Sequence, residues 1–372
     1  MADISEILGN NEIKEHFLTA VNYGKISHAY LLEGEKGSGK KMIASSFSKI
    51  LQCETSKRFP FSGKISQWEE KDANSGNMSR ELPLSATISA CGKCESCIQT
   101  EHKTHPDIIW VTHEKPAIIK VGEIRDQVIH TIDIKPYKGP YKIYIIDDAE
   151  KMNAEAQNAL LKSIEEPPEY AVFFLLTNNR GALLDTILSR CILLPVKPVS
   201  KDQIIDYLIK REEITKEEAE FAAAFSMGNI GKAILAATSE EFQEIKQVTV
   251  ALLKMIHEAE IYEIEESVKK LKGWKDRIDD FFDIFLIWFR DLLFFKIDSK
   301  KSKDKIIFKG ESLSLKKQAD MISLESIDYI IRRIDCAKTR IRANVNFDVS
   351  IELLFLETRR EFQHKIKGEN NG

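Results

Sequence analysis

The stretch "GEKGSGKK", Gly34 to Lys41, has the spacing of a phosphate-binding loop, with glycines at positions 34 and 39 and Lys40 directly after the second. In such a loop, backbone N–H groups surround phosphate oxygens and the lysine reaches the terminal phosphates. The loop follows the apolar run "AYLLE" and precedes residues 41–51, whose apolar side chains recur at helical spacing. The sequence therefore predicts a strand, a phosphate loop and a helix in succession.

Three further apolar runs indicate that the first strand belongs to a parallel sheet. They are "DIIWV" (107–111), "YKIYIID" (141–147) and "AVFFLLT" (171–177). Short, almost continuously apolar strands are typical of a parallel sheet with helices on both faces. After about Lys201 the apolar residues recur at helical spacing, so the rest of the chain is predicted to be helical. The predicted fold class is α/β, similar to P-loop NTPases, followed by helices.

Two substitutions at the predicted nucleotide site argue against ATP hydrolysis by this chain. The residue after Lys40 is normally Ser or Thr, whose hydroxyl coordinates Mg²⁺, and here it is Lys41. In "IYIIDD", Asp147 has the place of a magnesium-binding carboxylate and Asp148 that of the group that orients the attacking water. The second position normally needs the longer glutamate, and a misplacement of about 1 Å can lower a rate roughly a hundredfold. We therefore predict no autonomous ATPase, with a helix N-cap as the structural alternative for the aspartates.

Six cysteines in a chain that lacks the pattern of an export signal suggest metal binding rather than disulfides. Three of them form "CGKCESC", namely Cys91, Cys94 and Cys97. A closed structural zinc site needs four ligands. Cys53 is the predicted fourth ligand, with His102 and His105 as alternatives. Three free thiols remain the other interpretation.

The charge balance limits the possible contacts with nucleic acid. The chain has 54 Lys and Arg against 58 Asp and Glu, a formal net charge of −4. This argues against a protein that coats nucleic acid, although a local basic segment could contact it. One lysine-rich segment is such a candidate, with a solvated loop as its alternative. Its lysines are Lys296, Lys300, Lys301, Lys303, Lys305 and Lys309.

The sequence has no pattern of export or membrane insertion. The N-terminal residues include acids where a secretory signal has a basic region and an apolar core. The most apolar stretch, residues 281–295, is interrupted by Asp283, Arg290 and Asp291 and is too short to span a bilayer. We expect this stretch to form a buried helix and the protein to be cytoplasmic.

Taken together, these motifs resemble the clamp-loader branch of the AAA+ ATPases. The resemblance covers essentially all of residues 5–195 and rests on "ILGNNEIKEHF", the phosphate loop, "CGKCESC", "HPDI", "YKIYIIDDAEKMNAEAQNALLKSIEEPP", "FLLTNN" and "LLDTILSRC". It implies that Arg190 is an arginine finger that reaches into the ATP site of a neighbouring subunit. It also implies structural zinc on the four cysteines and a degenerate nucleotide site in this chain. The residues of that site are Gly34, Gly37, Gly39, Lys40, Lys41, Asp147, Asp148, the first-sensor residues Thr177 and Asn178, and the second-sensor residue Lys232.

The resemblance further implies three domains. Residues 1–197 would form the AAA+ domain with a zinc-binding insertion at about 53–105, residues 198–241 a small helical lid, and residues 242–372 a helical collar.

The partners follow from the same resemblance. The expected assembly is a hetero-pentamer with the tau/gamma motor subunits and the delta subunit of DNA polymerase III. It opens the sliding clamp and places it on primer–template DNA during DNA replication. In it this chain would be a stator that does not hydrolyse ATP, a non-catalytic part of an assembly with DNA polymerase activity. An active ATPase of the tau/gamma type is the alternative.

Overall fold

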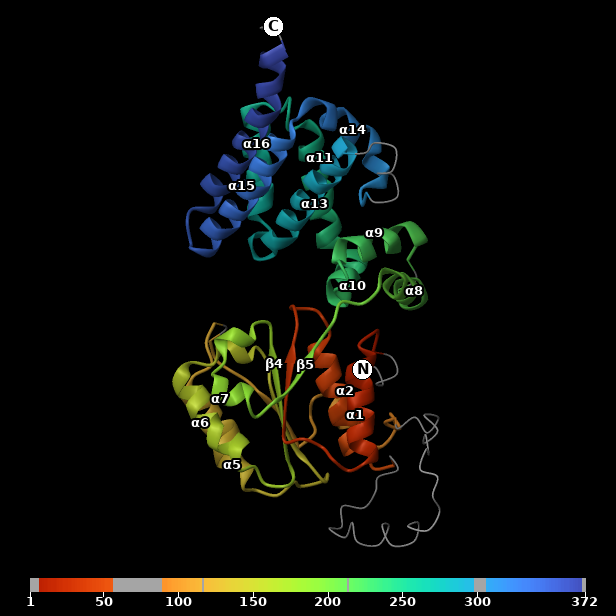
Figure 1. Cartoon of the computed structure of the whole chain (residues 1–372), viewed down its shortest axis with the longest axis vertical. Helices are drawn as coiled ribbons and strands as arrows, with labels where there is room; N and C mark the ends of the chain where they lie inside the picture. The colour runs from red at the N-terminus through yellow and green to blue at the C-terminus, as the bar shows by residue number, and fades with distance from the viewer. Residues whose placement is uncertain (1–6, 56–88, 116, 213, 298–305, 370–372) are drawn as a thin grey trace, which may run out of the picture. The chain divides into compact units, whose positions relative to one another are not determined.

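The computed structural model describes residues 7–55, 89–115, 117–212, 214–297 and 306–369 (Figure 1). The chain divides into two compact units. The first comprises Met1–Gln203 with Asn229–Gly231, and the second comprises Ile204–Gly228 with Lys232–Gly372. The predicted division into AAA+ domain, lid and collar stays a prediction.

Parts of two predicted segments lie outside the described residues. One is the larger part of the insertion, residues 56–88. The other is the middle of the basic segment, residues 298–305, with Lys300, Lys301, Lys303 and Lys305.

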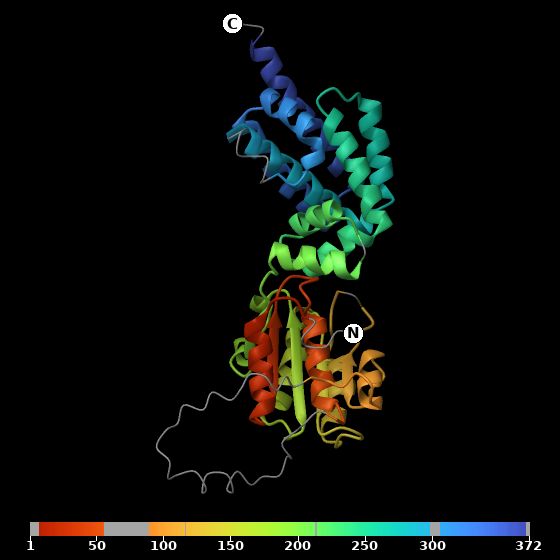
Figure 2. The same ribbon diagram turned by 90° about the vertical axis from the view of Figure 1, so that its right-hand side faces the viewer.

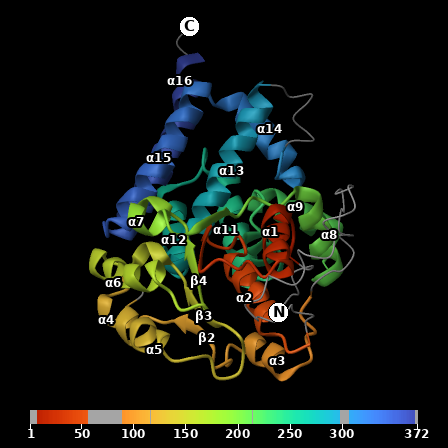
Figure 3. The ribbon, with the colours of Figure 1, turned by 60° about the horizontal axis from the view of Figure 1, so that its bottom comes forward.

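The first unit is built on a parallel sheet. Its described strands are β1 (Ala29–Glu33), β2 (Ile108–Val111), β3 (Lys142–Ile146), β4 (Ala171–Thr177) and β5 (Ile192–Pro195). They follow the order β2-β3-β4-β1-β5, and every neighbouring pair is parallel. Figure 3 labels β2, β3 and β4 side by side. The predicted parallel sheet is confirmed. Because the strands are parallel, the polar residues that follow their carboxyl ends meet at one edge.

Helices cover both faces of this sheet, as predicted. On one face lie α1 (Asn11–Asn22) and α2 (Lys40–Gln52), drawn in red in Figure 2. The other face is covered by α4 (Val121–Ile124), η3 (Arg125–Ile129), α5 (His130–Ile132), α6 (Ala154–Glu165) and α7 (Asp185–Leu188). The remaining short elements of the first unit are α3 (Glu95–Glu101), η4 (Ala149–Lys151) and η5 (Arg180–Ala182).

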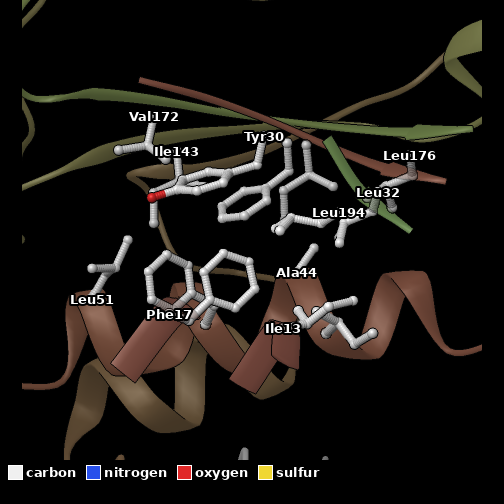
Figure 4. Packing of buried hydrophobic residues seen from close by; sticks show 14 of the residues in the cluster. Ile13, Phe17, Tyr30, Leu32, Ala44, Leu51, Ile143, Val172, Leu176 and Leu194 are labelled. Carbon is white, nitrogen blue, oxygen red and sulfur yellow. The ribbon is translucent and has the colours of Figure 1, made fainter. Parts of the chain in front are cut away.

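Each face of the sheet has its own apolar core. On the face of α1 and α2, the ring of Phe17 stacks on that of Phe47 with 3.9 Å between centroids, and Tyr30 stacks on Phe174 at 5.4 Å. Figure 4 shows Phe17 and Tyr30 in this core. Successive residues of β1 alternate between the cores, with Tyr30 in the first and Leu31 in the second. Both faces of β1 are therefore buried, which explains why its sequence is apolar without interruption.

The described residues after β5 form helices only, as predicted. They are α8 (Lys201–Arg211), α9 (Lys216–Ser226), α10 (Ile230–Thr238), α11 (Glu240–Met255), α12 (Ile261–Lys272), η6 (Lys275–Arg277), α13 (Ile278–Ile297), η8 (Lys309–Glu311), α14 (Ser312–Met321), α15 (Leu324–Arg342) and α16 (Phe347–Glu369). The apolar stretch 281–295 lies in α13, where Phe281, Phe285 and Trp288 are buried, so the predicted buried helix is confirmed. Among the described helices, none combines the length and apolarity needed to cross a bilayer.

Candidate functional site

The phosphate loop connects β1 to α2 at the carboxyl edge of the sheet. Gly37 and Gly39 have φ values of +89° and +98°, in the left-handed region that other residues rarely adopt. Gly39 is the N-cap residue of α2. A Cβ atom on Gly37 would also lie 2.7 Å from Oδ1 of Asn229. The backbone conformation of the loop therefore requires glycine at both positions.

Lys40 is folded back onto this loop. Its side chain is buried, and Nζ donates to the carbonyl oxygens of Gly34 (2.5 Å) and Glu35 (2.9 Å) and to Oδ1 of Asn178 (2.7 Å). An ammonium group has three donors, so these bonds use all of them. Burial lowers the pKa of Lys40, and the nearby carboxylates, Glu150 foremost, oppose this shift. The amine that would reach a bound phosphate therefore has partners within the chain.

Lys41, which stands where a phosphate loop normally has Ser or Thr, forms an ion pair with a carboxylate. Its Nζ lies 2.5 Å from Oδ2 of Asp147. The next carboxylate, Asp148, pairs with Lys151 at 2.6 Å. Partial burial opposes ionisation of Asp148, but the hydrogen bond and the charge of Lys151 outweigh it and lower the pKa. Both carboxylates therefore contact lysines of the chain itself, and without a hydroxyl this donor set does not fit the usual magnesium site.

Glu150 joins the two predicted sensor residues to the loop, and the sequence analysis missed it. Its carboxylate accepts hydrogen bonds from Oγ1 of Thr177 (2.8 Å), from Nδ2 of Asn178 (2.8 Å) and from the backbone N–H of Asn178 (3.3 Å). Asn178 in turn accepts from Lys40. The sequence "DDAEKM" does show a third carboxylate, Glu150, shortly after Asp147 and Asp148. The pairing of β3 with β4, which brings Thr177 beside Glu150, cannot be deduced from the neighbouring residues in the sequence.

The segment Asn229–Gly231 contacts the phosphate loop within the first unit. Nδ2 of Asn229 donates to the carbonyl oxygen of Lys36 (2.8 Å), and the N–H of Gly231 donates to that of Gly37 (2.9 Å). A Cβ atom on Gly231 would lie only 2.7 Å from the Gly37 oxygen, so a larger residue would push the two segments apart. Glycine is therefore required at this contact.

Lys232, the predicted second sensor, belongs to the second unit. Its Nζ lies 3.0 Å from Oδ2 of Asp283, and Oδ1 of the same carboxylate lies 3.4 Å from Nζ of Lys338. The sensor role of Lys232 stays a prediction.

Four cysteines lie close enough to share one ion. The sulfur atoms of Cys53, Cys91, Cys94 and Cys97 all lie within 4.8 Å of one another, and those of Cys91 and Cys97 are 3.9 Å apart. Four sulfurs held tetrahedrally at the ordinary Zn–S distance of about 2.3 Å are themselves about 3.8 Å apart. The set therefore fits a closed tetrahedral metal site, and the fold brings Cys53 into it.

The two histidines considered as alternative ligands lie outside this cluster. His105 is buried, and its Nδ1 accepts a hydrogen bond from the backbone N–H of Asp107 (3.1 Å). His102 is the C-cap residue of α3.

Hydrogen bonds to sulfur favour the thiolate form of Cys91. Its Sγ accepts from the N–H groups of Lys93 (3.5 Å) and Cys94 (3.3 Å). A hydrogen bond with Thr55, together with these two, lowers the pKa of Cys91 to about 6, whereas burial raises that of Cys97. A metal ion binds thiolates, so these bonds favour the ligand form of Cys91.

Arg190 follows α7 and is held by three oxygen atoms. One terminal nitrogen, Nη2, lies 2.8 Å from Oε1 of Glu165. The other, Nη1, donates to the carbonyl oxygen of Thr186 (2.8 Å) and to Oγ of Ser189 (3.2 Å). The side chain remains 38% exposed, so part of the guanidinium faces solvent.

The two described lysines of the basic segment have partners within the chain. Nζ of Lys296 donates to the carbonyl oxygen of Ala319 (2.9 Å), and Lys309 pairs with Glu220 at 2.9 Å. Contact of this segment with nucleic acid stays a prediction.

A parallel α/β sheet with a phosphate loop after β1 and an acidic pair after β3 defines a protein of the P-loop class. The sequence matches the family described as "DNA polymerase III, delta subunit" over residues 9–66 and 70–200, a little over half of the chain, and the chain belongs to this family.

Two similar proteins are named as subunits of DNA polymerase III. DNA polymerase III subunit delta' of Bacillus subtilis is 27% identical over 342 residues, which cover 91% of this chain and 92% of that protein. DNA polymerase III subunit tau of Escherichia coli is 28% identical over 273 residues, which cover 70% of this chain but only 38% of tau. The structure of a gamma subunit-related protein from Thermotoga maritima aligns with 93% of this chain and 99% of its own, at 18% identity and a TM-score of 0.44.

Proposed function

We propose that this chain is a clamp-loader subunit of the delta' type in bacterial DNA polymerase III. It is a cytoplasmic stator that supplies Arg190 to the ATP site of a neighbouring tau/gamma subunit while the assembly, which also contains delta, loads the sliding clamp onto primer–template DNA. Membership of the family and the likeness to delta' over nine-tenths of both chains support the subunit type.

The ion pair between Lys41 and Asp147 carries the proposal that this subunit does not hydrolyse ATP. Mg²⁺ bridges the nucleotide phosphates, and it needs the hydroxyl that Lys41 replaces. The ammonium of Lys41 neutralises the one carboxylate that would hold the ion. Asp148 is likewise engaged, with Lys151, and is shorter than the glutamate that orients water. Nucleotide binding at this site is therefore weak or absent.

The four cysteines hold structural zinc in this proposal. All four ligand positions of a tetrahedral ion are filled by protein sulfur, which leaves no open position for a substrate or a reactive water. Two of the cysteines, Cys53 and Cys97, are fully buried, as befits a site that stabilises the fold.

Arg190 acts in trans through the exposed part of its guanidinium, which contacts no other group among the described residues. A planar guanidinium neutralises charge on a transferred phosphoryl group, often across a subunit contact, and is worth about 10³- to 10⁵-fold in rate at the site that it serves. Its contacts with Glu165 and Thr186 leave it 38% exposed.

The test is ATP turnover, first by the purified chain and then by the reconstituted loader. We expect no phosphate release by the chain alone, and a large loss at the neighbouring site in the loader with Arg190→Ala. Arg332→Ala is a matched control, because Arg332 is also exposed and paired with one carboxylate, Asp328. Unchanged turnover and clamp loading by the Arg190→Ala loader would overturn the finger role.

A second candidate is an active motor of the tau/gamma type. It is favoured by the identity with tau over 70% of this chain. Magnesium-dependent phosphate release by the isolated chain would select this candidate, and its absence would select the stator.

A further inference from the structure

The carboxyl end of α6 places a carboxylate beside Arg190. Oε1 of Glu165, the last residue of α6, lies 2.8 Å from Nη2 of Arg190. The opposite terminal nitrogen, Nη1, donates to the carbonyl oxygen of Thr186 in α7 and to Oγ of Ser189, the C-cap residue of α7. The guanidinium is therefore held from two sides, by the end of α7 and by the end of α6.

These contacts leave part of the guanidinium unused. Guanidinium has five N–H donors in a planar fork. Within the described part of the chain its contacts involve only Nη1 and Nη2, and the side chain is 38% exposed. Nε–H has no contact among the described residues, and Nη2, which Glu165 contacts, carries two N–H groups, so Nε–H and the second N–H of Nη2 remain able to donate together to a phosphate.

The element that carries Glu165 is firmly connected to the segment that leads to Arg190. Gln157 of α6 is buried, and its Nε2 donates to the carbonyl oxygen of Ala182 (3.1 Å) while its Oε1 accepts from the N–H of Leu184 (2.8 Å). Asn153 caps the other end of α6 by accepting from Ala156 (2.8 Å). The contact between Glu165 and Arg190 therefore joins α6 to a segment that Gln157 already connects to it by two hydrogen bonds.

We propose that Glu165 is a positioning residue for Arg190, one that orients the guanidinium toward the terminal phosphate of a nucleotide held by the neighbouring subunit. This inference rests on the proposed function of Arg190 in trans. An arginine side chain has many rotamers, and a catalytic group held in the productive one contributes more to the rate than a freely moving one. Glu165 acts only through Arg190 and does not contact the nucleotide.

The experiment measures steady-state ATP turnover of the reconstituted loader with variants of this subunit. We expect Glu165→Ala to lower kcat roughly tenfold and to leave the KM for ATP unchanged, because the neighbouring subunit binds the nucleotide. Glu165→Gln should lose only about two- to threefold, because its amide oxygen still accepts the hydrogen bond. Glu166→Ala is the matched control, since it removes an exposed carboxylate one residue further on that forms no ion pair among the described residues. Its turnover should equal that of the unmodified loader.

A double substitution separates positioning from a general structural effect. In the Arg190→Ala loader, adding Glu165→Ala should cause no further loss, because a positioning residue has nothing left to position. If Glu165→Ala lowers turnover by the same factor in the Arg190→Ala loader as in the unmodified loader, the inference is overturned. It is also overturned if Glu165→Ala alone leaves turnover normal or raised while Arg190→Ala strongly lowers it. A fully active Arg190→Ala loader would instead refute the proposed function, and this inference with it. Equal amounts of assembled loader, measured by size-exclusion chromatography, are required for each comparison.

Discussion

Asp107 holds a surface loop by three backbone hydrogen bonds, and its removal should release that loop. The side chain is buried. Its Oδ1 accepts from the N–H of Tyr137 (2.6 Å), and its Oδ2 accepts from those of Lys138 (2.7 Å) and Gly139 (2.9 Å). Lys138 also pairs with Glu95 at 2.5 Å, beside Cys94 of the metal site. The loop is therefore connected to the cysteine cluster.

The expected size of the effect follows from the number and kind of these bonds. A hydrogen bond to a charged acceptor contributes about 1.5–3 kcal/mol, and bonds that share one acceptor are not additive. For Asp107→Ala we expect the free energy of opening the loop to fall by roughly 3–5 kcal/mol. This raises the equilibrium constant for loop opening by at least about a hundredfold. Asp107→Asn, with its oxygen in the place of Oδ2, keeps the bonds from Lys138 and Gly139 and should cost about half as much.

Hydrogen–deuterium exchange measured by mass spectrometry on a peptide that covers residues 134–141 tests this prediction. Asp107→Ala should speed exchange at least about a hundredfold, and Asp107→Asn by roughly tenfold. Asp133→Ala is the control, because Asp133 is an exposed aspartate just before the same loop. Exchange in Asp107→Ala within about threefold of the unmodified protein would refute the reasoning.

Three other outcomes are expected. Cys53→Ser should abolish stoichiometric metal in native mass spectrometry, whereas Cys191→Ser should retain it; metal retained by Cys53→Ser would contradict the four-sulfur site. Burial raises the pKa of Asp291 above its ordinary 3.8, so the folded state binds the proton of this carboxyl more tightly than the unfolded state does. This difference in proton binding stabilises the folded protein fully below about pH 4, and the stabilisation is lost as the pH rises through the higher folded-state pKa. The free energy of unfolding of Asp291→Asn minus that of the unmodified protein should therefore increase with pH in urea titrations, and a difference independent of pH would refute this. Lys41→Thr restores a hydroxyl and frees Asp147, so calorimetry should detect magnesium-dependent ATP binding that is at least about tenfold tighter, and unchanged affinity would show that another feature closes the site.

Much of the first unit was predictable because its signals are local. Each strand is a short apolar run bounded by polar residues, and both faces of the sheet are buried. The phosphate loop was predictable because its backbone needs glycine at Gly37 and Gly39. The continuous helical segment formed by α4, η3 and α5 was not predicted, although Ile124, Val128 and Ile132 recur at helical spacing.

The amino-acid sequence by itself determines which chemical groups are available. They are a phosphate loop with a second lysine in place of a hydroxyl residue, four cysteines, and an arginine after a short helix. Which groups meet depends on the tertiary structure. Parallel pairing of β3 and β4 brings Glu150 to Thr177 and Asn178, the place of β1 beside β4 brings Lys40 to Asn178, and the end of α6 meets Arg190. Such contacts join residues far apart in the chain, so periodicity and spacing, which act over a few residues, carry no record of them.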